Sequence, residues 1–178
     1  MKRLSNIVLF LLVTAFFSCE TKTEAKGDTN ATGSNANEML QTNREMYRAI
    51  ETGDSVTIRK HISSDAVDHN GGPNGEDLKG DEIVRALTSI HNDIDNLKFE
   101  VLEEAASDDH IFVMVHMTGT TNKPVWGMPA GHKMDGRSID VIKVSNGKMT
   151  DHWTYMEMAE LMKMMGGGNK EELPKGAQ

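Results

Sequence analysis

The chain has 178 residues and a formal net charge of −8, from 19 basic and 27 acidic residues. This acidic balance disfavours non-specific binding to nucleic acids, and no basic arm offsets it, so we expect no nucleic-acid partner. The only cysteine, Cys19, excludes a disulfide within the chain.

The first eighteen residues have the pattern of an export signal. A basic start, Lys2 and Arg3, precedes an apolar run over residues 7–17 that is too short to span a membrane comfortably. Small Ser18 then precedes Cys19. The segment resembles a bacterial lipoprotein signal, which implies cleavage before Cys19, acylation of that residue and an anchor in a membrane of the bacterial cell envelope. An ordinary secretory signal with an incidental cysteine is the alternative.

The rest of the chain divides into a tether, one domain and a tail. Residues 20–37 hold no large apolar residue, so we predict a flexible, disordered tether over residues 19–37. Residues 38–166 are long enough to form one domain with a real core, and residues 167–178 are predicted to be a disordered tail. Cleavage would leave 17 basic and 27 acidic residues and a formal charge of −10.

Three helices are predicted in the first half of the domain. Gly53 can close the first helix with a left-handed cap, and Asp54 can cap a short second helix. Asp81 can cap a third helix, which follows a short strand over residues 66–70 and a glycine-rich loop over residues 71–75. The predicted inner residues are Met39, Tyr47 and Ile50 in the first helix, Ile58 and Ile62 in the second, and Ile83, Leu87, Ile90 and Ile94 in the third.

The second half of the domain has the period of strands. Residues 97–101 alternate, and residues 111–121 indicate a long strand whose start is apolar enough to be covered on both faces. A loop over residues 122–133 then leads to a hairpin over residues 136–158, and a short helix is predicted near residues 157–165. Helices first and antiparallel strands later indicate an α+β fold with helices packed on one side of a curved sheet.

The hairpin is centred on Asn146-Gly147, a strong turn signal. A two-residue turn would set Asp140 opposite Trp153. A type I turn with Gly147 as a left-handed bulge would set Asp140 opposite His152, and we favour this register because it separates polar from apolar side chains. One face then carries Ser138, Asp140, His152 and Thr154, and the other carries Ile139, Val141, Trp153 and Tyr155.

Four short motifs resemble the SnoaL-like polyketide cyclase family of the nuclear transport factor 2-like superfamily, in matching order and spacing over residues 38–165. They are Gly53-Asp54, Asp68-His69-Asn70, Gly127-Met128-Pro129, and Asn146-Gly147-Lys148 followed by Asp151-His152-Trp153. The resemblance implies a cone-shaped, strongly curved, mostly antiparallel sheet wrapped around helices, an α+β roll. It also implies a homodimer that pairs through the sheets, as in many family members.

Some members of this family cyclise polyketide esters by an intramolecular aldol step, without a metal or an organic cofactor. In those cyclases the acid/base is an aspartate two residues after the histidine that matches His152. Here that position is Thr154, which cannot take up a proton near neutral pH. A second cavity residue, histidine in the cyclases, falls on Asp140, and the cavity asparagine matches Asn70. The resemblance therefore implies a cavity whose polar residues differ from those of the cyclases.

Asp140 and His152 are the candidate catalytic pair. The carboxylate would orient the imidazole and raise its pKa, which would make His152 a usable base near neutral pH. Asn70 or Ser138 could donate to a developing oxyanion, and Thr154 would lie beside them. A cross-strand ion pair that merely satisfies two polar groups is the alternative.

Three further residues are candidates for ligand binding. His69 precedes the glycine-rich loop and could face the cavity mouth, or equally be solvated. Trp126 and Met128 could cover a ligand as an apolar lid, or simply anchor their loop. The thirteen methionines include soft sulfur ligands of the kind that bind copper(I), but their spacing defines no metal geometry, so we expect no metal. We interpret the methionines as flexible side chains that fill the core and line the pocket.

The sequence therefore predicts an exported, lipid-anchored domain that binds a small, largely apolar organic molecule in its cone. A cofactor-free cyclase, isomerase or hydrolase that uses Asp140 and His152 is the first alternative. A non-catalytic, dimeric interaction domain is the second.

Overall fold

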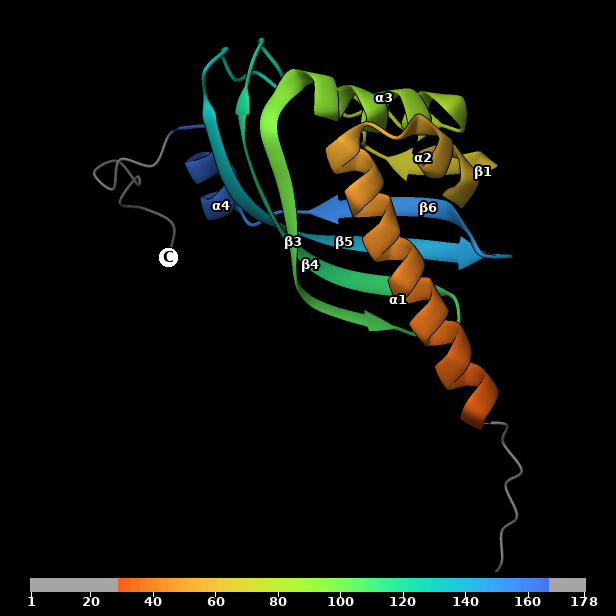
Figure 1. Cartoon of the computed structure of the whole chain (residues 1–178). Coiled ribbons are helices and arrows are strands. Elements are labelled where there is room, and N and C mark those ends of the chain that lie inside the picture. Colours follow the sequence, from red (N-terminus) through yellow and green to blue (C-terminus); the bar gives the residue numbers. More distant parts are fainter. Residues whose placement is uncertain (1–28, 167–178) are drawn as a thin grey trace, which may run out of the picture.

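The computed structural model describes residues 29–166, and the predicted export signal, Cys19 and the predicted tail lie outside this range (Figure 1). The helices are α1 (Thr29–Thr52), α2 (Ser55–His61), α3 (Asp81–Asp93) and α4 (Met158–Met164). The strands are β1 (Ile62–His69), β2 (Leu78–Lys79), β3 (Ile94–Ala106), β4 (His110–Thr121), β5 (Lys133–Ser145) and β6 (Lys148–Tyr155).

The six strands form one mixed sheet in the order β2-β1-β6-β5-β4-β3. Strands β1 and β6 run parallel, and every other neighbouring pair is antiparallel. Figure 1 shows the long strands bending around α1 and α3, which lie on the concave side of the sheet. The α+β class and the strongly curved, mostly antiparallel sheet are therefore confirmed.

The core fills the space between these helices and the concave face. Ile58, Ile83 and Ile94 are at most 2% exposed, and they belong to one cluster with Ile50 and Leu97. The aromatic ring of Tyr47 packs against Phe99 of β3, with ring centroids 5.2 Å apart. Helix α1 is thus fixed across the sheet by its apolar side, as its helical period predicted.

The caps around α2 agree with the sequence, but α1 starts earlier than predicted. Gly53 has a left-handed φ of +69°, and the Asp54 side chain accepts hydrogen bonds from the backbone N–H groups of Val56 and Thr57. Residues 29–37, predicted as part of a disordered tether, belong to α1. Once a helix is nucleated, each added residue gains one hydrogen bond at low cost, so it can extend beyond its packed part.

Helix α3 differs from the prediction at both ends. Gly80 is its N-cap, whereas the predicted cap, Asp81, is the first helical residue and pairs with Arg59. At the other end Ile94, predicted as the last residue of the apolar stripe, is the first residue of β3. Ile94 is still buried, because the chain turns from helix to strand without leaving the core.

The prediction that the start of β4 is covered on both faces is wrong. Val113 and Val115 are buried, whereas the alternate residues Phe112 and Met114 are 46% and 37% exposed. The reason is that the helices cover only the concave face, so every second residue of β4 points outward. Phe112, Met114, Ile139 and Tyr155 form the outer apolar patch, in which Ile139 is paired with both Met114 and Tyr155.

The predicted register of the β5–β6 hairpin is also wrong. Ser145 pairs with Lys148, and Asn146 and Gly147 both have positive φ, so the turn is the tight two-residue type. The ladder then skips Thr150, a bulge within β6, and Asp140 lies opposite Thr154 instead of His152. The turn and the bulge together shift the register by two residues from the prediction. An even shift preserves the faces, so the predicted separation of polar and apolar side chains is kept.

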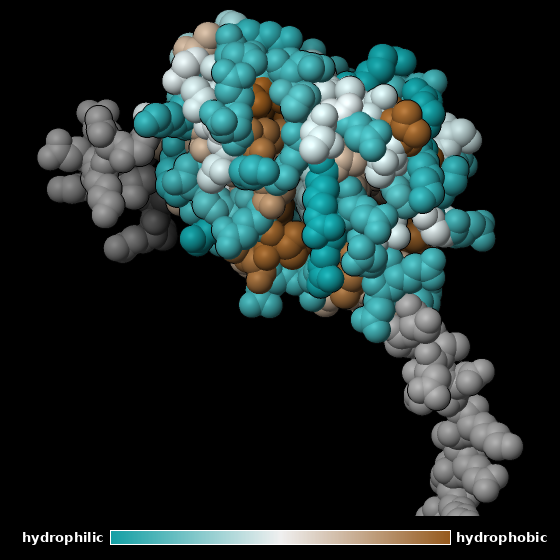
Figure 2. All heavy atoms as spheres, in the orientation of Figure 1, coloured by the Kyte–Doolittle hydropathy of each residue, from teal (hydrophilic) through white to brown (hydrophobic). Residues whose placement is uncertain are grey.

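The surface of the described residues is mostly polar. Figure 2 shows the side that carries α1 as largely hydrophilic, with hydrophobic side chains gathered beside the helix over β3 and β4. Within residues 29–166, no helix has the length and the apolar character needed to cross a membrane.

Candidate functional site

A cavity of about 650 Å³, here called the inner cavity, lies between the helices and the concave face of the sheet. Most of its wall is apolar, because the inward-facing residues of α1, α3 and β4 meet there. One side is different, since inward-facing residues of β1, β5 and β6 bring polar groups together. The apolar wall includes Ile50, Ile83, Leu87, Ile90, Phe99, Val115, Met117 and Met156.

The first polar contact joins Asp68 of β1 to His152 of β6. Parallel pairing of these strands places the two residues directly opposite each other. Nδ1 of His152 lies 2.7 Å from Oδ1 of Asp68, and their side chains are only 19% and 12% exposed. The carboxylate therefore orients the imidazole from the neighbouring strand.

The second polar contact centres on Asp140 of β5. Its carboxylate accepts hydrogen bonds from the hydroxyls of Tyr47 at 2.6 Å and Thr154 at 3.0 Å, and a longer one from Ser138 at 3.4 Å. Oγ1 of Thr154 also lies 3.4 Å from Nε2 of His152. Thr154 thus connects Asp140 to His152, which in turn contacts Asp68. The polar cluster consists of Asp68, His152, Thr154, Asp140 and Tyr47.

This arrangement favours the protonated form of His152. Burial alone would lower the pKa of His152, but the hydrogen bond to Asp68 and the charges of Asp140 and Asp68 outweigh it and raise the pKa. An imidazolium can donate through Nδ1 to Asp68 and through Nε2 to Thr154, whose hydroxyl donates onward to Asp140. Every polar atom along this path then has a partner.

Tyr47 has the opposite chemical character, because it holds its proton. Burial raises the pKa of Tyr47 well above its usual value, and the charge and hydrogen bond of Asp140 raise it further. The phenol is therefore a fixed donor at the end of the cluster. The cluster combines one cationic acid, two carboxylates and neutral hydroxyl donors, which is a suitable set for binding a carbonyl compound or for moving a proton.

The structure separates the residues of the predicted catalytic pair. Asp140 and His152 both line the inner cavity, but each has a different partner, and Thr154 lies between them. The predicted direct contact is wrong for two reasons. The hairpin register places Asp140 beside Thr154, and the parallel strand β1 supplies Asp68 to the imidazole.

The other predicted ligand-binding residues divide into two groups. Asn70, Trp126, Ser138 and Thr154 line the inner cavity, and Trp126 is 44% exposed at its rim. Met128 does not line it, because its side chain is 2% exposed and packs in the core.

His69 contributes to the rim of the cavity, but its imidazole is engaged elsewhere. The ring stacks on Trp153 with centroids 4.5 Å apart, and its Nε2 lies 3.2 Å from Oδ1 of Asp151. His69 follows Asp68 in β1, so the alternation of the strand directs its side chain to the opposite face.

Asp68 and Tyr47 were not among the predicted site residues. The signal for Tyr47 was its hydroxyl on an otherwise apolar helix face, because a buried phenol needs a partner. Asp68 and His69 are neighbours in a predicted strand, where successive side chains point to opposite faces. Only one of the two could therefore face the cavity, and the prediction chose His69. No local pattern showed that β1 would pair with β6. Within the described residues, no cluster of three or more His, Cys, Asp or Glu side chains could hold a metal ion.

Residues 40–165 match the model of a family described as SnoaL-like polyketide cyclase. Solved structures with the same fold include AclR from Streptomyces galilaeus, with 22% identity, a TM-score of 0.60, and coverage of 74% of this chain and 97% of that one. An LEH-like epoxide hydrolase of M. tuberculosis shares 13% identity at a TM-score of 0.61, covering 74% and 86%.

A SnoaL-like polyketide cyclase from Agrobacterium tumefaciens has 10% identity and a TM-score of 0.61, covering 72% of this chain and 98% of that one. None of the curated proteins matches the chain. At these identities the solved structures establish the fold.

Proposed function

Because this chain belongs to the SnoaL-like polyketide cyclase family, we propose that its inner cavity binds a small, largely apolar organic molecule. The observation that carries the proposal is the mostly apolar inner cavity of about 650 Å³ with one buried polar cluster on its wall. Cavities of this size hold small organic ligands, and a few polar groups on an apolar wall fix their orientation.

A titration with the neutral, apolar fluorophore N-phenyl-1-naphthylamine tests this proposal. Ser138 faces the inner cavity, so Ser138→Phe fills part of it and should weaken binding by roughly tenfold, about 1.4 kcal/mol. The neighbouring residue Arg137 is exposed and points to the other face, so Arg137→Phe is the matched control and should bind as the wild type does. Absence of saturable binding to the wild type, or equal losses in both variants, would contradict the proposal.

The same proposal includes export and a lipid anchor at Cys19, which the order of basic, apolar and small residues before Cys19 supports. Expression of the full chain in a bacterium fed an alkyne-tagged fatty acid tests this part. The expected result is label in the membrane fraction that disappears in Cys19→Ala. An unlabelled wild-type protein would contradict it.

A second candidate function is a cofactor-free cyclase, isomerase or hydrolase, and the Asp68–His152 contact of 2.7 Å favours it. Family cyclases use a carboxylate at the position of Thr154, and here the carboxylate of Asp140 lies 3.0 Å from the Thr154 hydroxyl. Asp140 would accept the proton from the substrate's acidic carbon, and Ser138 or Asn70 would donate to the enolate oxygen. His152 and Tyr47 would stabilise the charge of Asp140 and set its orientation.

Exchange of the α-proton of a β-keto ester for deuterium would test the enzymatic candidate, because it requires removal of a proton from an acidic carbon. Activity should be lost in His152→Gln and in Asp140→Asn while circular dichroism shows a folded domain. His91→Gln is the control, because His91 is exposed on α3, lines neither cavity and should leave activity unchanged. Activity that survives in His152→Gln would eliminate this candidate.

A third candidate is a dimer that pairs through its sheets. The outer apolar patch supports it, because four large apolar side chains lie exposed together on adjacent strands. Pairing of two such faces would leave both inner cavities open, so this assembly is compatible with ligand binding.

A further inference from the structure

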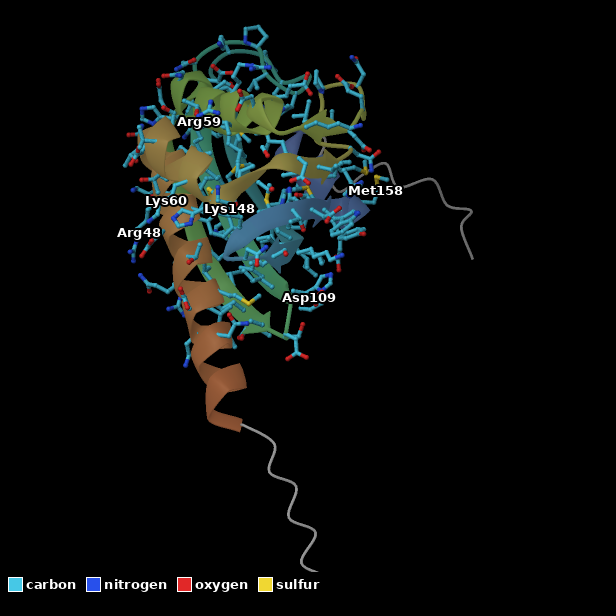
Figure 3. The ribbon with its side chains drawn as sticks, turned by 90° about the vertical axis from the view of Figure 1, so that its right-hand side faces the viewer. Arg48, Arg59, Lys60, Asp109, Lys148 and Met158 are labelled. Carbon is cyan, nitrogen blue, oxygen red and sulfur yellow. The ribbon has the colours of Figure 1, made fainter. Side chains whose placement is uncertain are left out.

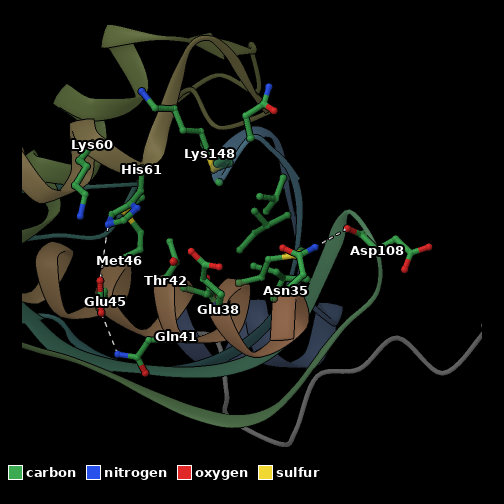
Figure 4. A pocket seen from close by; sticks show the side chains of 18 residues that line it. Asn35, Glu38, Gln41, Thr42, Glu45, Met46, Lys60, His61, Asp108 and Lys148 are labelled. Atoms are coloured by element: carbon green, nitrogen blue, oxygen red, sulfur yellow. Dashed lines mark hydrogen bonds and ion pairs between the residues drawn. The ribbon is translucent and has the colours of Figure 1, made fainter. Parts of the chain in front are cut away.

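A second cavity of about 780 Å³, here called the outer cavity, lies beside α1 at the end of the sheet that carries the β5–β6 turn. Its wall comes from α1, the end of α2, the start of β4 and both arms of the hairpin. Figure 4 shows α1 along its floor, with Lys60 and His61 toward one end and Asn35 and Asp108 toward the other.

The two cavities are neighbours that share part of their walls. Asn43 and Met46 of α1, Ile142 of β5 and Met149 of β6 line both of them and form the septum. Two of these side chains are methionines, which are unbranched and change rotamer easily. The cavities are therefore divided by side chains that line both of them, and rotamer changes of the two methionines could connect the cavities.

The outer cavity contains buried polar nitrogens that have no partner in the described part of the chain. Nδ2 of Asn43 and Nε2 of His61 are both buried without a hydrogen bond, although the two residues are only 5% and 8% exposed. The nearest carboxylate oxygen to His61 is that of Glu45 at 3.9 Å, too far for a hydrogen bond, and Gln41 binds the other oxygen of Glu45. Each unpaired nitrogen carries a desolvation cost that an acceptor on a ligand would remove.

Two cations lie at the same end of the outer cavity. Lys60 and Lys148 both line it, and Figures 3 and 4 show them on the same side of the molecule as the end of α2. Among the described residues neither lysine has a carboxylate within ion-pair distance, in contrast to Lys98, Lys123 and Lys163. Burial lowers the pKa of His61, the charges of Lys60 and Lys148 lower it further, and the charge of Glu45 partly offsets them.

We propose that the two cavities are the two halves of one tunnel for an elongated amphiphile, a linear alkanoate or a molecule of the same chemistry. The carboxylate lies in the outer cavity beside His61, Lys60 and Lys148, and the alkyl chain crosses the septum into the apolar inner cavity. This inference rests on the proposed function, because it assigns the inner cavity to the apolar part of the same ligand. Three acids line the outer cavity, and Glu45 is the one beside His61, at 3.9 Å from its Nε2. Gln41 donates to the other oxygen of Glu45, and the two lysines offset its charge, while Glu38 and Asp108 lie farther from Lys60.

Chain length is the property that separates a tunnel from two independent sites. A short chain such as hexanoate should stay in the outer cavity. Once the chain passes the septum, each added methylene enters the inner cavity and should strengthen binding by roughly fourfold. Methionine methyl groups report each step, because Met39 lines only the outer cavity, Met46 and Met149 line both, and Met117 lines only the inner one.

The experiment is a titration of the full chain, carrying ¹³C-methyl methionine, with hexanoate, decanoate and hexadecanoate below their micellar concentrations. Hexanoate should shift the signals of Met39 and of the septum methionines but leave Met117 unchanged, and hexadecanoate should shift Met39, Met149 and Met117 together at equal occupancy. The double variant Lys60→Gln/Lys148→Gln should weaken hexadecanoate binding by roughly fivefold, and Lys79→Gln/Lys133→Gln, which removes two lysines outside both cavities, should leave it unchanged.

Three results would overturn the tunnel. They are an affinity that does not increase with chain length, a Met117 shift without a Met39 shift, and equal behaviour of the two double variants. Saturable N-phenyl-1-naphthylamine binding with any of these results would leave the proposed function standing and remove only the tunnel. Ile142→Phe provides a second measurement in the septum, since it should limit binding of hexadecanoate to the level of a shorter chain while the probe still binds.

Discussion

At the scale of single residues, the polar cluster of the inner cavity sets the charge of His152. Its hydrogen bond to Asp68 and the charges around it raise the pKa of His152 above the usual value of 6.5. A group whose pKa is higher in the folded state stabilises the fold at low pH. This stabilisation is complete below about pH 6.5 and is lost as pH rises through the folded-state pKa.

We therefore expect the free energy of unfolding of the wild type, relative to that of His152→Gln, to fall as pH rises above 6.5. Urea unfolding of both proteins between about pH 5.5 and 8.5 measures this difference. His61 titrates in the opposite sense, because its pKa is lowered, but it is present in both proteins and cancels from the comparison. A difference that increases with pH would contradict the described environment of His152.

Tyr47 should contribute to stability through its hydroxyl. Tyr47→Phe removes the buried 2.6 Å hydrogen bond to Asp140 and leaves that carboxylate with weaker partners. We expect a loss of about 1–3 kcal/mol in the free energy of unfolding, measured with urea. Tyr155→Phe is the matched control, because this ring is 58% exposed and should show no change. Equal effects of the two variants would exclude the Tyr47–Asp140 contact.

The sequence predicted which residues of the hairpin face the cavity, but not which of them touch. Alternation of polar and apolar side chains determines the faces of β5 and β6, and any even shift in register satisfies it equally well. The partner of His152 depends on β1, which is far away in sequence and pairs in parallel, a contact that short-range patterns do not encode. Asp68 could therefore be found only in three dimensions.

At the scale of elements, the bulge at Thr150 absorbs one extra residue of β6. Deletion of Thr150 would give a continuous ladder in which Asp151 still lies opposite Lys143 and His152 still lies opposite Ile142, so His152 would stay on the cavity side. We expect this deletion to lower the free energy of unfolding by less than about 1 kcal/mol, because no side chain would change its environment.

Thr150→Ala is the control for this deletion. It keeps the length of β6 and removes only a long, 3.5 Å hydrogen bond to the Lys143 carbonyl, so it should cost less than about 1 kcal/mol. If thermal unfolding showed a loss of about 3 kcal/mol or more for the deletion but not for Thr150→Ala, the pairs assigned to the hairpin would be contradicted.

Element types were more predictable than element ends. Gly53 and Asp54 act as expected, because capping is a local property of the backbone. The start of α1 and the cap of α3 were not predicted, because helix propagation and the Arg59–Asp81 pair depend on what surrounds each end. The exposure of Phe112 depends on which face the helices cover, and the strand sequence does not contain that information.

At the scale of the whole molecule, the outer apolar patch predicts self-association. Met114 and Ile139 are paired across β4 and β5 and are 37% and 43% exposed, so Met114→Glu/Ile139→Glu would place two charges in the interface. Sedimentation should show a dimer for the wild type and a monomer for this variant. Val56→Glu, at an apolar residue of α2 that is 78% exposed, should leave the dimer intact. A wild type that sediments as a monomer would contradict the prediction.

The two cavities exist only because a long helix crosses a sheet that bends around it. The family resemblance predicted one hollow in the cone. The outer cavity depends on how α2 and the β5–β6 turn approach α1, which the sequence did not predict. The apolar inner cavity remains the feature on which the proposed binding function depends.

Methyl spectra of methionine-labelled protein during a titration with N-phenyl-1-naphthylamine test this claim most directly. Met117 and Met156 line the inner cavity, whereas Met114 and Met158 are exposed away from it. Binding in the inner cavity predicts saturable shifts of Met117 and Met156, with Met114 and Met158 unchanged. Shifts confined to Met114 and Met158, or no saturable shift at all, would contradict the account.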